Sequence, residues 1–191
     1  MNTKRKFISI NELKEEYSYY KIQKLITEKR IYKINKRYYE NLNFFGEDDE
    51  FYYVDVYISG GVVCQLSAAV YYELTTYRPH VIDVAVKRKR NITNLPDYPI
   101  MNPIYYSHDR YETGISIIRS NEGSYKIYDI EKTICDILFY RNKIGIDIMK
   151  EIVTNYIKRK DKDLNKLVMY AKKLNVYNTL KTYFEVLLWK V

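Results

Sequence analysis

The sequence predicts an α+β protein that begins with an N-terminal winged helix-turn-helix, continues with a small mixed sheet with helices, and ends in a helical C-terminal tail. Three observations predict this class. Two short amphipathic helical patterns and a β-prone hairpin fill the first forty residues, strand and helix patterns alternate in the middle, and only helical patterns follow Asp129. Apolar residues make up 47% of the 191 residues and charged residues 29%, which is enough apolar material for a folded core.

The charge changes sign along the chain and suggests where it divides. Residues 1–43 carry eleven Lys or Arg against five Asp or Glu, whereas residues 44–86 carry one against seven. We therefore expect a boundary between a basic N-terminal domain over residues 1–43, whose helix and hairpin patterns predict a DNA-binding domain, and a C-terminal domain over residues 44–191. The net charge of +8 suggests a polyanionic partner, although charge alone favours the simpler explanation that lysines solvate the surface.

Two capping signals predict the N-terminal helices. Ser9-Ile10-Asn11-Glu12 is a capping box and predicts a helix over about 10–17, because its Ser hydroxyl and Glu carboxylate satisfy backbone N–H groups at the helix start. Ser18 is a second N-cap and predicts a helix over 19–30. The apolar face of that helix is Ile22, Leu25 and Ile26.

A basic hairpin after the second helix completes the order of a winged helix-turn-helix. The runs 31–34 and 37–40 flank a turn at Asn35-Lys36. In such a fold the second helix enters the major groove of double-stranded DNA, and the hairpin approaches phosphates or a minor groove. The expected DNA-binding residues are Ser18, Tyr19, Tyr20, Lys21, Gln23, Lys24, Lys33, Lys36 and Arg37. The alternative is a helical hairpin and a ribbon that pack on the main domain with solvated lysines.

Strand and helix patterns alternate through the rest of the chain. Residues 49–58 fit either a strand or a helical face, and this ambiguity stays open. The expected strands are 81–86, 104–106, 115–119 and 125–128. The expected helices are 62–74, 130–140 with Asp129 as its cap, and three more near 146–159, 163–174 and 177–190. Pro96, Pro99 and Pro103 indicate irregular chain.

No catalytic, metal-binding or cofactor-binding constellation is recognisable. Gly60-Gly61 lacks the Gly-Lys-Ser/Thr that follows in a phosphate loop. Gly123-Ser124 lacks the downstream Asp-x-Asp pair with which a nucleotidyltransferase holds Mg²⁺. His80 and His108 have no partner at ligand spacing. We therefore expect no enzyme, no cofactor and no metal.

The cysteines and the hydropathy pattern indicate a cytoplasmic protein without a membrane partner. Cys64 and Cys135 match no metal or redox spacing, and both are expected to be reduced core residues. The uncharged stretch 56–72 is shorter than the ~20 apolar residues that a transmembrane helix needs. No apolar signal-peptide core follows the charges at residues 4–6.

Several segments of the chain are similar to AbiEi-family antitoxins. The strongest match is Tyr128-Asp129-Ile130-Glu131-Lys132-Thr133-Ile134-Cys135-Asp136, continued by residues 140–145. The other similar segments are 61–69, 74–76, 79–80, 84–88, 163–164, 170–171 and 187–188. The resemblance covers nearly the whole chain, but these segments carry no chemical motif. Within the strongest match, Asp129 and Asp136 also fit a simpler role, in which they cap and pair within one helix.

The resemblance implies an antitoxin of an abortive-infection, type IV toxin–antitoxin system. Such antitoxins pair a winged-helix domain, which binds inverted repeats in the promoter of their own operon and represses it, with a C-terminal antitoxin domain. That domain counteracts a nucleotidyltransferase toxin, and a stable complex is not required. The candidate antitoxin surface is Lys87, Arg88, Lys89, Arg90, Lys132, Arg141 and Lys143.

Three alternatives stay open at this point. The chain could sequester its toxin directly through the acidic block 47–50, or it could be a generic winged-helix transcriptional regulator. The basic run 87–90 equally fits a solvated loop or a sheet edge that is protected by Lys.

Overall fold

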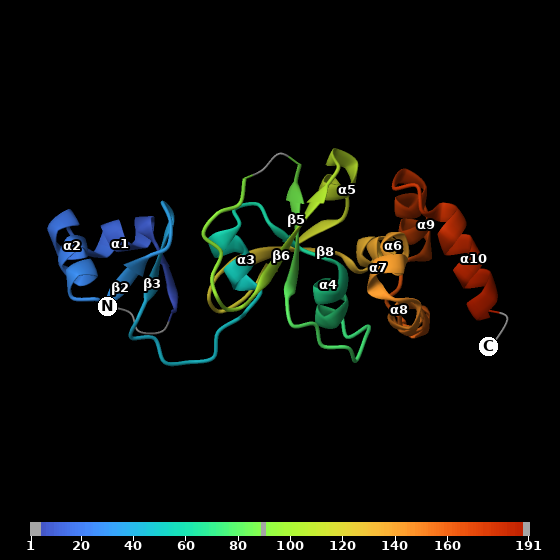
Figure 1. Ribbon diagram of the computed structural model, residues 1–191, viewed down its shortest axis with the longest axis horizontal. Coiled ribbons are helices and arrows are strands. Elements are labelled where there is room, and N and C mark those ends of the chain that lie inside the picture. Colours follow the sequence, from blue (N-terminus) through green and yellow to red (C-terminus); the bar gives the residue numbers. More distant parts are fainter. Residues whose placement is uncertain (1–4, 89–90, 189–191) are drawn as a thin grey trace. The chain divides into compact units, whose positions relative to one another are not determined.

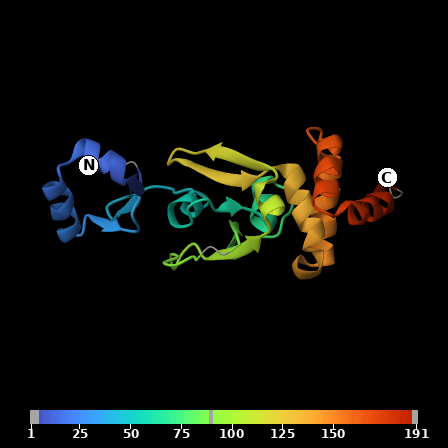
Figure 2. The same ribbon diagram turned by 90° about the horizontal axis from the view of Figure 1, so that it is seen from above.

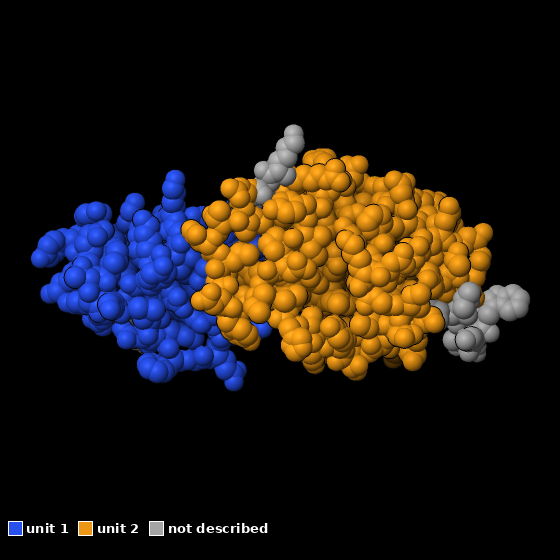
Figure 3. Space-filling model, viewed as in Figure 1, with its two compact units in different colours: residues 1–59, 119–125 blue, residues 60–118, 126–191 orange. Residues whose placement is uncertain are grey.

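A computed structural model describes residues 5–88 and 91–188 of the chain (Figure 1). The fold is mixed α+β with two sheets, so the expected fold class is confirmed at that level. The chain divides into two compact units, which are coloured separately in Figure 3. The first unit is Met1–Ser59 with Arg119–Tyr125, and the second is Gly60–Ile118 with Lys126–Val191.

The first unit contains a three-stranded antiparallel sheet and three helices. Its elements are β1 (Phe7–Ser9), α1 (Ile10–Glu16), α2 (Tyr19–Thr27), β2 (Ile31–Lys33), β3 (Tyr38–Asn41) and α3 (Tyr52–Tyr57). The strands lie in the order β1-β3-β2. The two helices and the hairpin expected from the sequence are present, whereas β1 was not expected, because three residues are too few to show an alternating pattern.

Both predicted caps are formed. The hydroxyl of Ser9 accepts a hydrogen bond from the backbone N–H of Glu12 at 3.2 Å, and the Glu12 carboxylate accepts one from the N–H of Ser9 at 2.8 Å. The hydroxyl of Ser18 accepts a hydrogen bond from the N–H of Lys21 at 3.4 Å. Each cap fixes the direction of its helix so that apolar side chains meet over the sheet. This small core is Leu13, Ile22, Leu25, Ile31 and Tyr39, all at most 5% exposed.

Helix α3 braces the three-stranded sheet. The Phe7 ring packs edge-on against Tyr53, with ring centroids 4.7 Å apart. The ammonium of Lys6 pairs with Asp48 at 2.8 Å, and the hydroxyl of Tyr38 donates to Asp55 at 2.9 Å. The first unit therefore extends beyond Asn43 to Ser59. The ambiguous segment 49–58 contains a helix because its side chains are buried on more than one face, which no alternating strand pattern would give.

The second unit is built on a mixed five-stranded sheet. Its first elements are β4 (Val62–Val63), α4 (Gln65–Tyr71), β5 (Ile82–Lys87), β6 (Met101–Tyr106), α5 (His108–Glu112), β7 (Ile115–Arg119) and β8 (Ser124–Tyr128). The strand order is β6-β5-β4-β8-β7. Strand β4 runs antiparallel to β5 and parallel to β8, and β5 runs parallel to β6. Figure 2 shows β7 and β8 as an antiparallel hairpin, whose tip Arg119–Tyr125 belongs to the first unit.

Three local expectations differ from the structure. The helix expected over 62–74 begins only at Gln65, because Val62 and Val63 form a short central strand between β5 and β8. Pro103 lies within β6 rather than in irregular chain. It is tolerated because β6 is at the edge of the sheet, where a missing N–H costs no ladder hydrogen bond. Helix α5 was not expected, since its five residues are too short for a helical period.

A helical tail completes the second unit, as expected. Its elements are α6 (Ile130–Phe139), α7 (Arg141–Ile144), α8 (Ile146–Lys158), α9 (Leu164–Lys173) and α10 (Tyr177–Leu188). Ile134, Leu138 and Met149 are fully buried in the core that α6, α8, α9 and α10 share with α4. Thr133 and Ile137 are also fully buried. In the described part of the chain, no helix has the length and apolar character needed to cross a bilayer.

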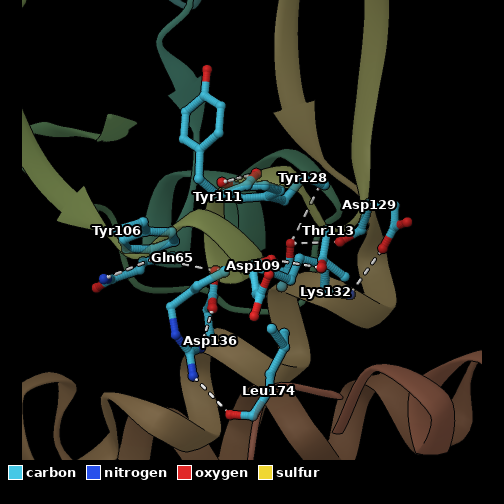
Figure 4. A network of polar contacts seen from close by, with 12 residues as sticks. Gln65, Tyr106, Asp109, Tyr111, Thr113, Tyr128, Asp129, Lys132, Asp136 and Leu174 are labelled. Atoms are coloured by element: carbon cyan, nitrogen blue, oxygen red, sulfur yellow. Dashed lines mark hydrogen bonds and ion pairs between the residues drawn. The ribbon is translucent and has the colours of Figure 1, made fainter. Parts of the chain in front are cut away.

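A buried ion cluster joins the sheet to this tail (Figure 4). It consists of Arg110 on α5 and of Lys132 and Asp136 on α6. Nη1 of Arg110 lies 2.8 Å from one oxygen of Asp136, and Nζ of Lys132 pairs with the other. The same carboxylate accepts a hydrogen bond from the hydroxyl of Tyr106 on β6 at 3.1 Å. Nη2 of Arg110 donates to the carbonyl of Leu174, just after α9, at 3.0 Å.

The cluster holds two cations and one carboxylate away from water. The side chains of Lys132 and Asp136 are fully buried, and burial lowers the pKa of Lys132 although the Asp136 carboxylate acts in the opposite direction. The ammonium of Lys132 lies 3.9 Å from the centroid of the Tyr128 ring, which favours its charge through a cation–π contact. Gly114, at φ +76°, has no room for a side chain, because a Cβ there would lie 2.5 Å from the Cβ of Lys132.

Loss of the carboxylate at position 136 should destabilise the second unit strongly. In Asp136→Ala, two buried cations lose the carboxylate that they share, and we expect a decrease of about 3–5 kcal/mol in the free energy of unfolding. Urea denaturation followed by far-UV circular dichroism measures this. Asp97→Ala, at an exposed loop carboxylate, is the matched control and should change stability by less than about 0.5 kcal/mol. Equal effects of the two substitutions would contradict the role assigned to the cluster.

Candidate nucleic-acid interface

Helix α2 presents its polar face to solvent. The burial of Ile22 and Leu25 against the sheet fixes which way the helix faces. Tyr19 and Tyr20, in its first turn, are 76% and 79% exposed. The other predicted DNA-binding residues of this segment, Ser18, Lys21, Gln23 and Lys24, are exposed as well.

A concavity of about 230 Å³ lies between α1, α2 and the hairpin. Tyr19 and Gln23 from α2 line it together with Lys33 from β2 and Lys36 from the turn of the hairpin. Residues predicted separately as helix and hairpin contacts therefore share one surface. Lys14 from α1 lines the same concavity and was not predicted. Its spacing from Ile10, one helical turn earlier, is the sequence signal that places both on one face of α1.

The cations of this surface differ in how strongly they are engaged. Lys24 lies 3.7 Å from Glu28 on the exposed side of α2, a contact that is easily exchanged for another anion. For Lys14, Lys21, Lys33 and Lys36, no ion pair is found among residues 5–88 and 91–188. Their ammonium groups are available to an external polyanion.

Arg37 is engaged inside the first unit. Its Nη2 donates to the backbone carbonyl of Asp55 at 2.6 Å, and its Nη1 lies 4.0 Å from the Asp55 carboxylate. The guanidinium also lies over the Tyr38 ring, 5.1 Å from the centroid. Arg37 therefore ties the hairpin to α3 through contacts with Asp55, whereas Lys24 pairs within its own helical segment.

The residues of the candidate antitoxin surface differ in exposure and in their contacts. Lys87 is exposed and pairs with Glu112 at 2.5 Å, and Arg88 is exposed beside it. Arg141 is half-buried, with its Nη1 donating to the carbonyl of Leu138 at 3.0 Å, and Lys143 is exposed on α7. Lys89 and Arg90 lie outside the described residues.

The placement of Lys132 on an exposed surface is wrong. Its side chain is fully buried and its charge is directed to Asp136, four residues later on α6. The simpler role of the two acids in this helix is the one observed. Asp129 accepts a hydrogen bond from the N–H of Lys132 at 2.8 Å as the N-cap of α6, and Asp136 forms the i,i+4 ion pair.

Among the described residues, the thiols and the histidines give no indication of a nucleophile or a metal site. Cys64 and Cys135 are free and buried, as expected, and burial raises the pKa of both thiols, that of Cys135 to about 12. Such thiols stay protonated near neutral pH and are poor nucleophiles. Within the described ranges, no group of three or more His, Cys, Asp or Glu side chains could hold a metal ion. The exposed His80 and His108 lie in a loop and at the start of α5.

Lysine labelling should separate the exposed cations from the buried one. When the folded protein is acetylated with a limiting reagent, Lys21, Lys33 and Lys36 should react, whereas Lys132 should be protected because its ammonium is enclosed and paired. Peptide mass spectrometry gives the extent at each site, and the same reaction in urea should label Lys132 as well. Rapid labelling of Lys132 in the folded protein would contradict its burial.

None of the protein-family models matches this chain, and none of the curated protein sequences does. The likeness to AbiEi-family antitoxins therefore rests on local segments of the sequence alone.

Proposed function

We propose that this chain is a DNA-binding antitoxin of a type IV, AbiE-like toxin–antitoxin system. In this proposal the first unit is a winged helix-turn-helix that binds the promoter of its own operon and represses it. The second unit counteracts a nucleotidyltransferase toxin. The observation that carries the DNA-binding half is the shared concavity, which brings Tyr19 and Gln23 of α2 beside Lys33 and Lys36 of the hairpin.

The first unit has the parts that duplex recognition needs. Helix α2 is capped at Ser18, and its first turn projects two exposed tyrosines and Lys21, which suits contact with base edges in a major groove. Lys33 and Lys36 supply cations for the phosphates that border the groove. Each phosphate contact releases condensed counterions, so the affinity should fall steeply with salt.

The residues proposed to contact DNA differ from those that form the core of the first unit. Phe7, Leu13 and Leu25 are buried, whereas the proposed contact residues are exposed. The three-stranded sheet is braced by α3, because Phe7 packs edge-on against Tyr53 and Tyr38 donates to Asp55. A surface on a braced scaffold presents its side chains with little further ordering, which favours binding.

The DNA-binding half predicts a change in salt dependence. Replacing both hairpin lysines, in Lys33→Ala with Lys36→Ala, should weaken binding to the upstream region of the gene. It should also reduce the slope of log affinity against log salt by about two, because each lost phosphate contact removes about 0.9 from that slope. Gel-shift titrations between 50 and 200 mM salt measure it.

The matched control is Lys172→Ala with Lys173→Ala, an equally basic and exposed pair on α9. This control should leave affinity and slope unchanged if binding is local to the concavity. Equal loss in both double variants would instead indicate binding through net charge alone. An unchanged slope in the hairpin variant would remove the hairpin from the interface.

The antitoxin half is supported by the resemblance and by the exposed cations of the second unit. Lys87 and Arg88 stand at the end of β5, and Lys143 stands on α7. These residues belong to another compact unit than the concavity. Repression and protection from the toxin should therefore be separable by mutation.

A rescue experiment tests this separation. With a nucleotidyltransferase encoded next to the gene as the toxin, Lys33→Ala with Lys36→Ala should lose promoter repression but still restore growth. Lys87→Ala with Arg88→Ala should restore growth less well and still repress a reporter. Loss of both activities in both variants, with folding intact by circular dichroism, would contradict the division of labour. Stable co-purification of the two proteins would favour direct sequestration.

A further inference from the structure

A cleft of about 580 Å³ lies wholly within the second unit. This volume is in the range of roughly 300–1,000 Å³ that is typical of small-molecule sites. Residues of α4, β5, β6 and α7 line it, with further aliphatic side chains closing its sides. None of the polar groups at the base of this cleft takes part in the proposed DNA contacts.

The base of the cleft presents hydrogen-bond acceptors. Asp83 and Gln65 are only 6% and 7% exposed, although both line the cleft. Nδ2 of Asn102 donates to one oxygen of Asp83 at 2.9 Å. The side-chain amide of Gln65 donates to the hydroxyl of Tyr106 at 3.3 Å, which leaves its carbonyl oxygen as an acceptor. Gln65 has φ +47°, a left-handed conformation that is rare for a residue other than glycine and that clusters at functional sites.

The Asp83 carboxylate is a buried acceptor that lines the cleft. Burial raises its pKa, and the hydrogen bonds from Asn102 and from the backbone of Leu66 oppose this rise without cancelling it. A ligand that brought further N–H groups to this carboxylate would stabilise its charged form. Because the Asp83 carboxylate and the Gln65 carbonyl oxygen are both acceptors in the lining, the base of the cleft suits a ligand with adjacent hydrogen-bond donors.

Aromatic rings and a cation line the walls and the mouth of the cleft. Tyr77, Tyr105 and Tyr140 line the cleft, and their rings are suited to pack against a planar, aromatic ligand. Lys143 also lines it and is exposed, so its ammonium is placed to pair with an anion outside the base of the cleft. A ligand that fits all three parts is flat, donor-rich at one end and anionic at the other.

We propose that this cleft binds a purine nucleotide whose base carries adjacent N–H donors, which describes a guanine nucleotide. The ring N–H and amino group of guanine donate to Asp83 and Gln65, the ring packs against the tyrosines, and the phosphate pairs with Lys143. A cation alone would be repelled by Lys143, and inorganic phosphate alone would leave the acceptors at the base unused. The site does not depend on the proposed DNA binding.

Isothermal titration calorimetry of the full chain tests the ligand class. Guanosine 5′-monophosphate should bind saturably at one site. Guanosine should bind at least threefold more weakly, because it lacks the phosphate. Purine riboside 5′-monophosphate, which lacks the donors, and uridine 5′-monophosphate should each bind at least tenfold more weakly. The absence of saturable guanosine monophosphate binding up to millimolar concentration, or equal binding of all four compounds, would overturn the proposal.

Two variants with matched controls test the residues. Asp83→Asn should weaken guanosine monophosphate binding at least tenfold, and Asp97→Asn, at an exposed carboxylate, should not. Lys143→Ala should weaken binding of the nucleotide at least threefold while leaving guanosine unaffected, and Lys150→Ala on α8 should alter neither. If Asp83→Asn does not fold by circular dichroism, the comparison at Lys143 decides. Unchanged affinity for the nucleotide in Lys143→Ala would overturn the assigned geometry.

Discussion

The second unit depends on how one carboxylate, Asp136, is satisfied in the interior. Two cations and a tyrosine hydroxyl converge on it, and they come from β6, α5 and α6, while Arg110 also reaches the chain that follows α9. An isolated buried charge is costly, so these elements must be assembled together or not at all. The cluster thereby fixes the sheet against the helical tail and, with it, the walls of the cleft.

The first unit is stabilised in part by interactions between residues that are close together in the sequence. Serine caps start α1 and α2, and the short sheet closes below them. Two residues of the acidic segment that follows support this sheet. Asp48 pairs with Lys6, and Asp55 accepts a hydrogen bond from Tyr38. This is why the sharp change of sign in the charge near residue 43 lies inside a compact unit. A charge reversal along a chain can mark two surfaces that attract each other within one unit.

The sequence predicted those features that are encoded over a few residues. The capping box at Ser9, the cap at Ser18 and the periodic helices of the tail all depend on neighbours within one or two turns. The concavity could be predicted in part, because the exposed faces of α2 and the hairpin follow from the buried ones. Contacts between distant segments could not be predicted. Arg110 and Asp136 are 26 residues apart, and no local pattern distinguishes Lys132, which is buried, from the exposed lysines around it.

The concavity of the first unit has a consequence for how such a protein can change over time. The side chains that line it from α2 and the hairpin include Gln23, Lys33 and Lys36, all exposed, whereas the packing beneath them relies on other residues. Because these side chains are exposed, substitutions on this rim should have little effect on folding stability. Such a surface can vary through many combinations of side chains while the scaffold that carries them stays the same.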